Sequence, residues 1–247
     1  MNTPITIVMI TYHRPDTVTK ALAALADADG DFHVSLIDNS SGAIDHILNQ
    51  YSDNCRFSIY KNEMNIGKSR SYDKWFSQLI ASDNNAYFLS LDDDVIVPRD
   101  FLIRYRLGYE AAISEFRGKR VMALSPVLTD KSENDIAYQL NNKYLSYHGI
   151  APDFKSGLII QKTSHVCGAA FLIDTKLFIK HGLYGVEQIY GGDDSYVCEV
   201  CAANNYGIGI ITDFLVQHLS NQGDVEYISW KGKNLTNQNL RIGFYDR

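Results

Sequence analysis

The chain has 247 residues, of which 45% are hydrophobic and 21% charged; this is ordinary for a globular protein and long enough for one large α/β domain. Its formal net charge of −6 argues against a general nucleic-acid-binding protein, which normally carries a basic excess. Its four cysteines are too few for a secreted disulfide framework. The first apolar run, 5–10, is too short for a signal peptide or a membrane span, so we expect a cytoplasmic protein without a transmembrane segment.

Strand and helix patterns alternate through the first eighty residues. Apolar runs predict strands over 5–10, 32–37 and 57–60. A helix begins at Pro15 and ends before Gly30, and a shorter one spans 43–51. The polar loop 62–70 leads into a further helix that reaches Ile80. This β-α-β-α-β order is typical of a parallel sheet covered by helices.

The second half of the chain continues the alternation after one interruption. We predict a helix over 101–116, strands over 121–127, 169–173 and 208–211, and a helix that ends near Asn204. Between 129 and 164 the pattern weakens, and this segment is the best candidate for a variable insertion that faces a partner. Four side chains in it suit contact with an acceptor: Tyr138, Tyr144, Tyr147 and His148.

Three consecutive aspartates follow an apolar strand over 87–91. Carboxylates placed together at the end of a buried strand repel one another unless a cation lies between them. Because side chains alternate on extended backbone, we expect Asp92 and Asp94 to point the same way and Asp93 the other. Oxygen donors at the carboxyl edge of an α/β sheet suit Mg²⁺ or Mn²⁺. The alternative is an acidic turn before the helix over 101–116.

Several motifs in order resemble those of the nucleotide-sugar-dependent glycosyltransferases of the GT-A fold, most closely family 2. They are the turn 11–15 after the first strand, Asp38 after the second, Asn65-Ile66-Gly67 with Arg70, the aspartate triplet, and Gly191-Gly192-Asp193-Asp194. Together they span about residues 5–220. The resemblance implies an α/β fold of GT-A type, a Rossmann-like open twisted sheet that is mostly parallel, with helices on both faces.

The resemblance also assigns roles to residues. Asp92 and Asp94 match the metal-binding Asp-x-Asp, and His218 falls where some members supply a further ligand. Asp193 and Asp194 match the acidic pair from which the general base comes, and which of the two takes the proton is left open. The residues implied at the nucleotide-sugar donor are Thr11, Tyr12, Arg14, Asp38, Asn65, Gly67, Arg70, Asp92 and Asp93.

Other residues carry two interpretations. Lys68, beside Arg70 at a helix start, is either a solvated cation or, as its position near a nucleotide site favours, a diphosphate contact. Asp193 could cap its helix while Asp194 faces the acceptor. Cys198 and Cys201 have zinc or redox spacing, and Cys167 with His165 could complete a site, but the place of the pair among apolar helix positions favours packing.

The expected activity is inverting transfer of a sugar from a nucleoside-diphosphate donor, expected to be a UDP-sugar, to a hydroxyl of a glycan, a lipid-linked sugar or another acceptor, with Mn²⁺ or Mg²⁺. The alternatives are a sugar-nucleotide nucleotidyltransferase, and an inactive sugar-binding or scaffold protein. A modified DNA base is an acceptor that the acidic charge disfavours. We expect one domain, with a nucleotide-sugar half over 1–127, an acceptor half over 128–220, and a tail over 221–247. Gly223 and Trp230 could make that tail a lid.

Overall fold

The N-terminal strand lies inside a sheet that is buried on both faces. The computed structural model describes residues 5–79, 86–129, 159–182, 191–219, 225 and 227–233. In β1, Ile7 and Met9 enter one hydrophobic core, while Val8 between them enters the other. This alternation follows from the two-residue period of a strand, and it explains why the run is apolar throughout rather than at every second residue.

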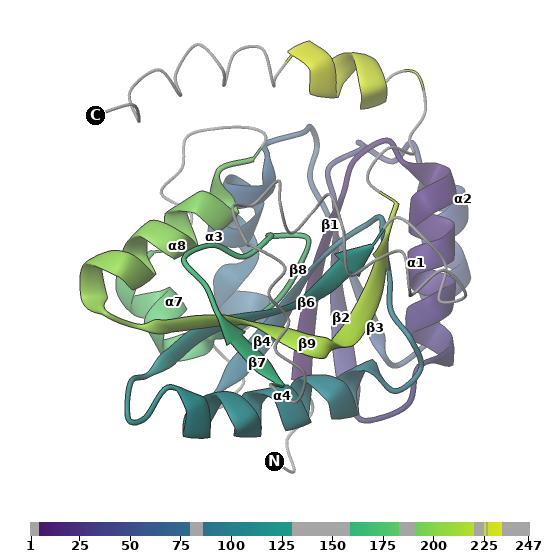
Figure 1. The fold of residues 1–247 in the computed structure, drawn as a ribbon. Helices are drawn as coiled ribbons and strands as arrows, with labels where there is room; N and C mark the ends of the chain where they lie inside the picture. The colour runs from purple at the N-terminus through teal and green to yellow at the C-terminus, as the bar shows by residue number, and fades with distance from the viewer. Residues whose placement is uncertain are drawn as a thin grey trace.

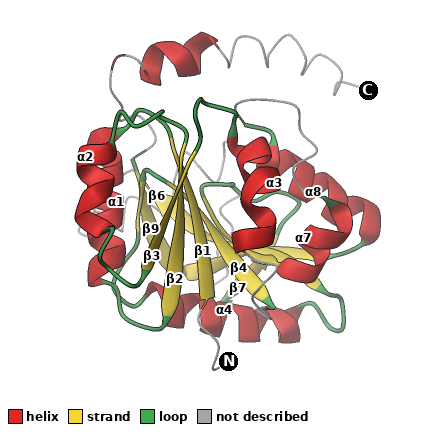
Figure 2. Ribbon diagram, turned by 180° about the vertical axis from the view of Figure 1, so that it is seen from behind, coloured by secondary structure: helices red, strands yellow, loops and turns green. Residues whose placement is uncertain are grey.

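The described strands form one nine-stranded sheet with helices on both faces (Figures 1 and 2). The strands are β1 (Ile5–Thr11), β2 (Phe32–Asp38), β3 (Phe57–Lys61), β4 (Tyr87–Asp92), β5 (Val95–Ile96), β6 (Val121–Thr129), β7 (Ile160–Lys162), β8 (Ala170–Asp174) and β9 (Gly207–His218). The helices are α1 (Pro15–Asp27), α2 (Asp45–Leu48), η1 (Asn49–Tyr51), α3 (Lys68–Leu79), α4 (Phe101–Glu115), α7 (Thr175–His181) and α8 (Asp193–Asn204). Residues 227–233 are also helical.

The sheet has a parallel half and a mixed half. Its order is β3-β2-β1-β4-β8-β6-β9-β5, with β7 paired to β9. The first four strands are parallel to one another, whereas β8 runs antiparallel to both β4 and β6. The α/β fold of GT-A type is therefore confirmed, and the predicted parallel arrangement holds most clearly in the N-terminal half.

Two cores hold the helices to the sheet. One contains the inner faces of α1 and α4, including Leu22, Leu25 and Phe101. The other contains α3, α7 and α8, including Tyr72 and Phe178. Because burying such side chains is the main favourable term in folding, these cores hold the strand ends in a constant arrangement. The site described below lies at those ends.

Two local predictions are wrong. Asp93 and Asp94 do not continue the strand: they form a turn, after which β5 joins the opposite edge of the sheet. The last strand does not end at Ile211, because β9 passes through a register shift opposite Pro126 and Val127 and continues to His218. Val95 of β5 then pairs with His218, and this long-range pairing cannot be read from either local pattern.

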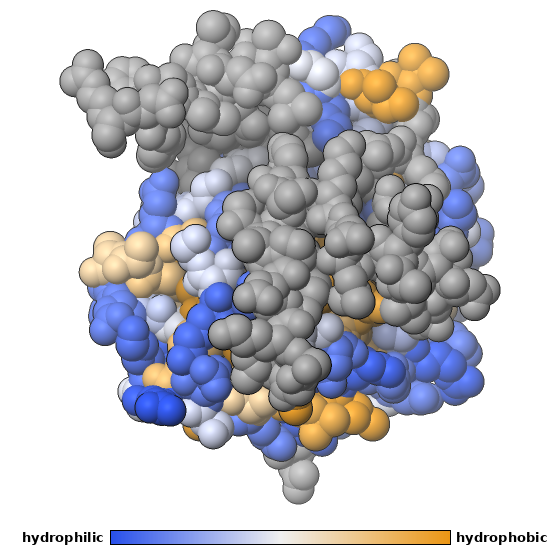
Figure 3. Space-filling view, in the orientation of Figure 1, coloured by the Kyte–Doolittle hydropathy of each residue, from blue (hydrophilic) through white to orange (hydrophobic). Residues whose placement is uncertain are grey.

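The outer surface is mostly polar, with apolar exceptions on α4. Ile103, Leu107 and Ile113 are exposed there, and orange surface lies along the lower edge of the molecule where α4 runs (Figure 3). Within the described ranges, no helix combines the length and the apolar character needed to cross a membrane.

Candidate active site

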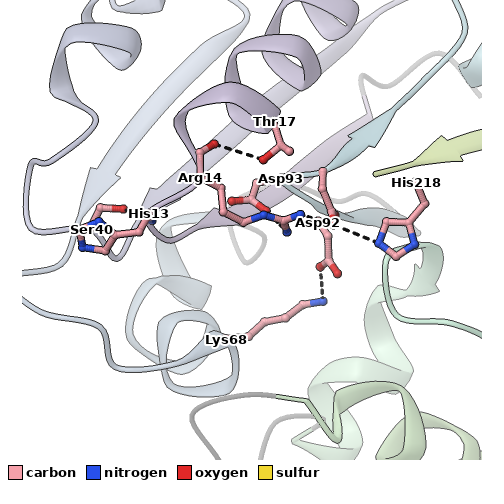
Figure 4. A network of polar contacts seen from close by, with 9 residues as sticks. His13, Arg14, Thr17, Ser40, Lys68, Asp92, Asp93 and His218 are labelled. Carbon is pink, nitrogen blue, oxygen red and sulfur yellow. Dashed lines mark hydrogen bonds and ion pairs between the residues drawn. The ribbon is translucent and has the colours of Figure 1, made fainter. Parts of the chain in front are cut away.

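The carboxyl ends of β1 and β4 bring a buried arginine against the aspartate triplet. Arg14 lies immediately before α1, and its guanidinium donates to Asp93 Oδ1 at 3.0 Å and to Asp94 Oδ2 at 2.5 Å. Figure 4 shows the Arg14 side chain pointing toward Asp93 from the start of α1. Burial works against the guanidinium charge, but Asp93 and Asp94 outweigh it and raise the pKa of Arg14. The turn thus has a permanent counter-charge.

His218 completes a group that could hold a metal ion. One ligand atom each from Asp92, Asp94 and His218 lie within 4.8 Å of one another, and His218 Nε2 is 3.2 Å from Asp94 Oδ2. Burial alone would raise the pKa of Asp94, but the charges of His218 and Arg14 hold it below its usual range. Asp94 Oδ1 is buried and has no hydrogen-bond partner among the described residues. Two carboxylates and an imidazole suit Mn²⁺ better than Mg²⁺, which prefers oxygen ligands alone.

A second acidic group lies at the start of α8, where Gly191 and Gly192 both have positive φ. The expected cap is wrong: Gly192 occupies the N-cap position, and the Asp193 side chain forms an ion pair with Lys68 at 2.8 Å. Asp194 accepts the N–H groups of Ser195 at 2.7 Å and Gly168 at 3.4 Å. Burial, and then the charge of Asp193, raise the pKa of Asp194.

Lys68 lies between the two acidic groups. It is the first residue of α3, and its Nζ donates to Asp92 Oδ1 at 2.8 Å and to the Gly168 carbonyl at 3.2 Å, in addition to its pairing with Asp193. Figure 4 shows the Lys68 side chain extending toward Asp92. Burial raises the pKa of Asp92, and Lys68 opposes that shift.

The predicted nucleotide-contacting residues line the neighbouring loops. Thr11 is buried at the end of β1, and the Tyr12 ring lies 4.8 Å from that of Trp230. Asn65 Oδ1 accepts the N–H of Gly67 at 2.9 Å, and the φ of Gly67 is +83°, a conformation that favours glycine. Arg70 is exposed on α3. These residues surround the same edge of the sheet.

The Asp38 carboxylate is hydrogen-bonded to the backbone of its own turn. It is fully buried at the end of β2, and its carboxylate accepts the N–H groups of Ser40 at 2.7 Å and Gly42 at 3.4 Å. This is the local turn that an aspartate commonly stabilises. Its predicted role in reading a base stays a prediction.

The sequence reasoning did not single out several residues of this region. The Tyr227 ring lies under the Arg14 guanidinium, 4.5 Å from its carbon. Asn39, Asn62 and Ser71 form a buried hydrogen-bonded group beneath the Asn65 loop. Polar residues just after predicted strands were an available signal for Asn39 and Asn62, whereas no local signal identifies Tyr227.

Other predictions lie outside the described residues or find no support. The insertion aromatics Tyr138, Tyr144, Tyr147 and His148, and also Gly223, lie outside the described residues. Within the described ranges, Asp92, Asp94 and His218 are the only cluster of this kind that could hold a metal ion, and it contains no cysteine. Cys198 and Cys201 are buried in α8, and Cys198 Sγ accepts the N–H of Val166 at 3.4 Å. The packing interpretation of this pair is therefore the one that the structure supports.

The fold and this edge of the sheet define a GT-A-type protein. Residues 6–106 match the family described as Glycosyl transferase family 2. The resemblance of the chain to family 2 glycosyltransferases of the GT-A fold is thereby confirmed. No curated protein matches the chain.

Solved structures agree on the fold. The mannosyltransferase PcManGT from Pyrobaculum calidifontis, in complex with GDP-Man and Mn²⁺, is 15% identical over 98% of this chain and 65% of its own, with a TM-score of 0.64. S. aureus TarS 1–349 in complex with UDP-GlcNAc is 14% identical over 90% of this chain and 60% of its own, with a TM-score of 0.61. GalNAc-T7 with UDP, GalNAc and Mn²⁺ is 11% identical over 87% and 43%, with a TM-score of 0.61. The chain spans less than two thirds of the length of each of these proteins.

Proposed function

We propose that the chain is an inverting glycosyltransferase that moves a sugar from a nucleoside diphosphate, such as a UDP-sugar, to an acceptor hydroxyl. The observation that carries the proposal is that two acidic groups, one at the end of β4 and one at the start of α8, lie at one edge of the sheet and contact the same lysine. The group Asp92, Asp94 and His218 suits a divalent ion, and Asp194 at the start of α8 suits a general base. The family match over 6–106 supports the donor side of this assignment.

The chemistry follows from what each group can do. A divalent ion held by Asp92, Asp94 and His218 would neutralise the negative charge that develops on the leaving diphosphate. Asp194 takes the proton of the acceptor hydroxyl as its oxygen bonds to the anomeric carbon, and the bond from that carbon to the diphosphate oxygen breaks. Attack on the face opposite the leaving group inverts the anomeric configuration. Arg14 and Lys68 keep the carboxylates of the site from repelling one another.

Asp194 is the better candidate for the base. Asp193 is paired with Lys68, whereas Asp194 accepts two backbone N–H groups and lies 3.9 Å from His165. A pKa raised above the ordinary range of a carboxyl group brings a base closer to the working pH and strengthens its proton affinity.

Residues 227–233 support the proposal of a lid over the donor. This helix places Tyr227 against Arg14 and Trp230 against Tyr12. Burial, and then the charge of Arg14, lower the pKa of Lys231, and the charges of Asp94 and Asp92 oppose that shift. The aromatic rings would exclude water from the sugar, and Lys231 would meet the diphosphate.

A panel of nucleotides and nucleotide sugars tests the function. With Mn²⁺, specific ligands should raise the unfolding temperature, because binding to the native state stabilises it by mass action. The best sugar nucleotide should then be hydrolysed slowly without an acceptor and turned over faster with a glycan or lipid-linked acceptor. A requirement for a nucleoside triphosphate would indicate a nucleotidyltransferase instead. Binding without turnover would indicate a sugar-binding protein.

A further inference from the structure

One ammonium group connects the two acidic groups of the site. Lys68 Nζ lies 2.8 Å from Asp92 Oδ1, 2.8 Å from Asp193 Oδ2 and 3.2 Å from the Gly168 carbonyl oxygen. These acceptors belong to β4, to α8 and to the loop before β8. An ammonium has three N–H groups, and three acceptors among the described residues lie within 3.2 Å of this one. The side chain is 19% exposed.

We propose that Lys68 is a positioning residue, which sets the distance between the metal-binding end of β4 and the base-bearing start of α8. The inference deepens the proposed function and rests on it. A lysine that binds Asp92, Asp193 and Gly168 together acts through the protein groups it holds. It therefore differs from a lysine whose role is to bind the diphosphate.

Gly168 gives independent support, because it makes the junction too tight for a side chain. A Cβ atom at Gly168 would lie 2.8 Å from Asp193 Oδ2 and 3.2 Å from Asp194 Cβ. The backbone of Gly168 is hydrogen-bonded on both sides: its carbonyl accepts from Lys68, and its N–H donates to Asp194 Oδ2. The loop, the helix start and the lysine are thus packed into one joint.

The joint also distinguishes the two aspartates of α8. Lys68 offsets the charge of Asp193, whose side chain is 11% exposed, while that of Asp194 is 22% exposed. Two adjacent carboxylates repel each other, so neutralising Asp193 lets Asp194 stay close without being displaced. Lys68 thereby holds Asp194 in place through its neighbour.

Ligand binding and turnover separate the two roles of Lys68. In Lys68→Met, we expect the Kd of UDP with Mn²⁺ to change by less than about 3-fold, while kcat falls by about 10- to 100-fold, the range seen when supporting partners of a site are removed. Lys68→Arg should recover part of kcat. Lys162→Met is the matched control, since Lys162 pairs with Glu115 at 2.9 Å outside the site. A large loss of UDP affinity with kcat unchanged at saturation would make Lys68 a diphosphate contact and overturn the proposal.

A stability cycle tests the joint without any assay of activity. Lys68→Met leaves Asp193 without its counter-charge, so it should lower the unfolding temperature more in the wild-type background than in Asp193→Asn. If the unfolding-temperature shifts of the two substitutions simply added, Lys68 and Asp193 would not be coupled, which would contradict the proposal. If the wild type turns over no sugar nucleotide, the proposed function fails, and this cycle alone decides the role of Lys68. If Lys68→Met does not fold, the neutral variant Lys68→Gln with Asp193→Asn completes the cycle.

Discussion

The two acidic groups at the sheet edge differ in what neutralises them. The aspartates after β4 are bound by Arg14, Lys68 and His218. At the start of α8, Asp193 forms an ion pair with the same Lys68. Asp194 instead accepts backbone N–H groups and lies farther, at 3.9 Å, from His165. His218 and Arg14 lower the pKa of Asp94, whereas burial raises the pKa of Asp92 despite Lys68. Burial, and then the charge of Asp193, raise the pKa of Asp194.

This difference indicates two kinds of chemistry. A carboxylate that stays ionised over the whole physiological range is suited to hold a cation. A carboxylate with a raised pKa is suited to accept a proton. Asp94 and Asp194 are thus suited to two different purposes, and burial together with the neighbouring charges makes the difference.

The largest effect is expected when the base is removed. Asp194→Asn should leave UDP and Mn²⁺ affinity nearly unchanged and lower kcat by about 10²- to 10⁴-fold, the usual scale for loss of a general base. Steady-state kinetics with calorimetry would measure both. Asp193→Asn is the matched control and should cost less; if it cost more turnover at equal donor affinity, the two roles would have to be exchanged.

Removal of a proposed metal ligand should weaken the Mn²⁺-dependent binding of UDP rather than the proton transfer. Asp94→Asn should weaken Mn²⁺-dependent binding of UDP by about 100-fold or more, because it removes a ligand and disturbs the pairing with Arg14. Asp93→Asn, outside the ligand group, should be much milder. Calorimetric titration with UDP and Mn²⁺ would show the difference, and equal losses in the two variants would contradict the assignment.

The pH profile should respond to charges around Asp194. Because the base must be ionised, kcat should fall about tenfold per pH unit below the pKa of Asp194. Asp193→Asn removes a charge that raises this pKa, so the acidic limb should move to lower pH. His165→Gln removes a charge that lowers the pKa of Asp194, so the acidic limb should move to higher pH. Shifts in the same direction in both variants would exclude Asp194 as the titrating group.

An added side-chain atom at Gly168 should destabilise the fold. Gly168→Ala places a methyl group 2.8 Å from Asp193 Oδ2, and such overpacking usually costs about 1–3 kcal/mol of unfolding free energy. Thermal unfolding would measure it. Gly232→Ala is the control, because in the part of the chain that the structure describes no atom lies within 4 Å of a Cβ there. Equal stability of the two variants would show that the Gly168 loop adjusts freely.

The smallest effect concerns the helix over 227–233. Trp230→Ala removes a ring contact with Tyr12, worth about 0.5–1.5 kcal/mol for such aromatic pairs, so UDP affinity should fall only several-fold. UDP with Mn²⁺ should also protect the wild-type chain from trypsin at Lys231 and Lys233. Cleavage at equal rates with and without ligand would remove the lid and leave the metal and base assignments unchanged.

The sequence alone determined the elements and the order of the motifs. Apolar periodicity located β1, α1 and β2 closely, because both faces of β1 and one face of α1 are buried. It also located the aspartate triplet and the α8 pair, since strand ends and glycine turns have strong local signatures. The metal-binding group Asp92, Asp94 and His218 was predicted from these positions and the family resemblance.

Only the tertiary structure decided how these groups are paired. The Asp93–Asp94 turn lets both residues meet Arg14, which lies 79 and 80 positions away in the sequence. The register shift in β9 brings His218 beside Asp94. Both contacts depend on strand pairing between distant segments. Lys68 at the start of α3 likewise meets Asp193 at the start of α8 only because the packed fold brings these two distant helix starts together. Local patterns encode burial and backbone conformation, whereas charge pairing depends on which distant segments the packed cores bring together.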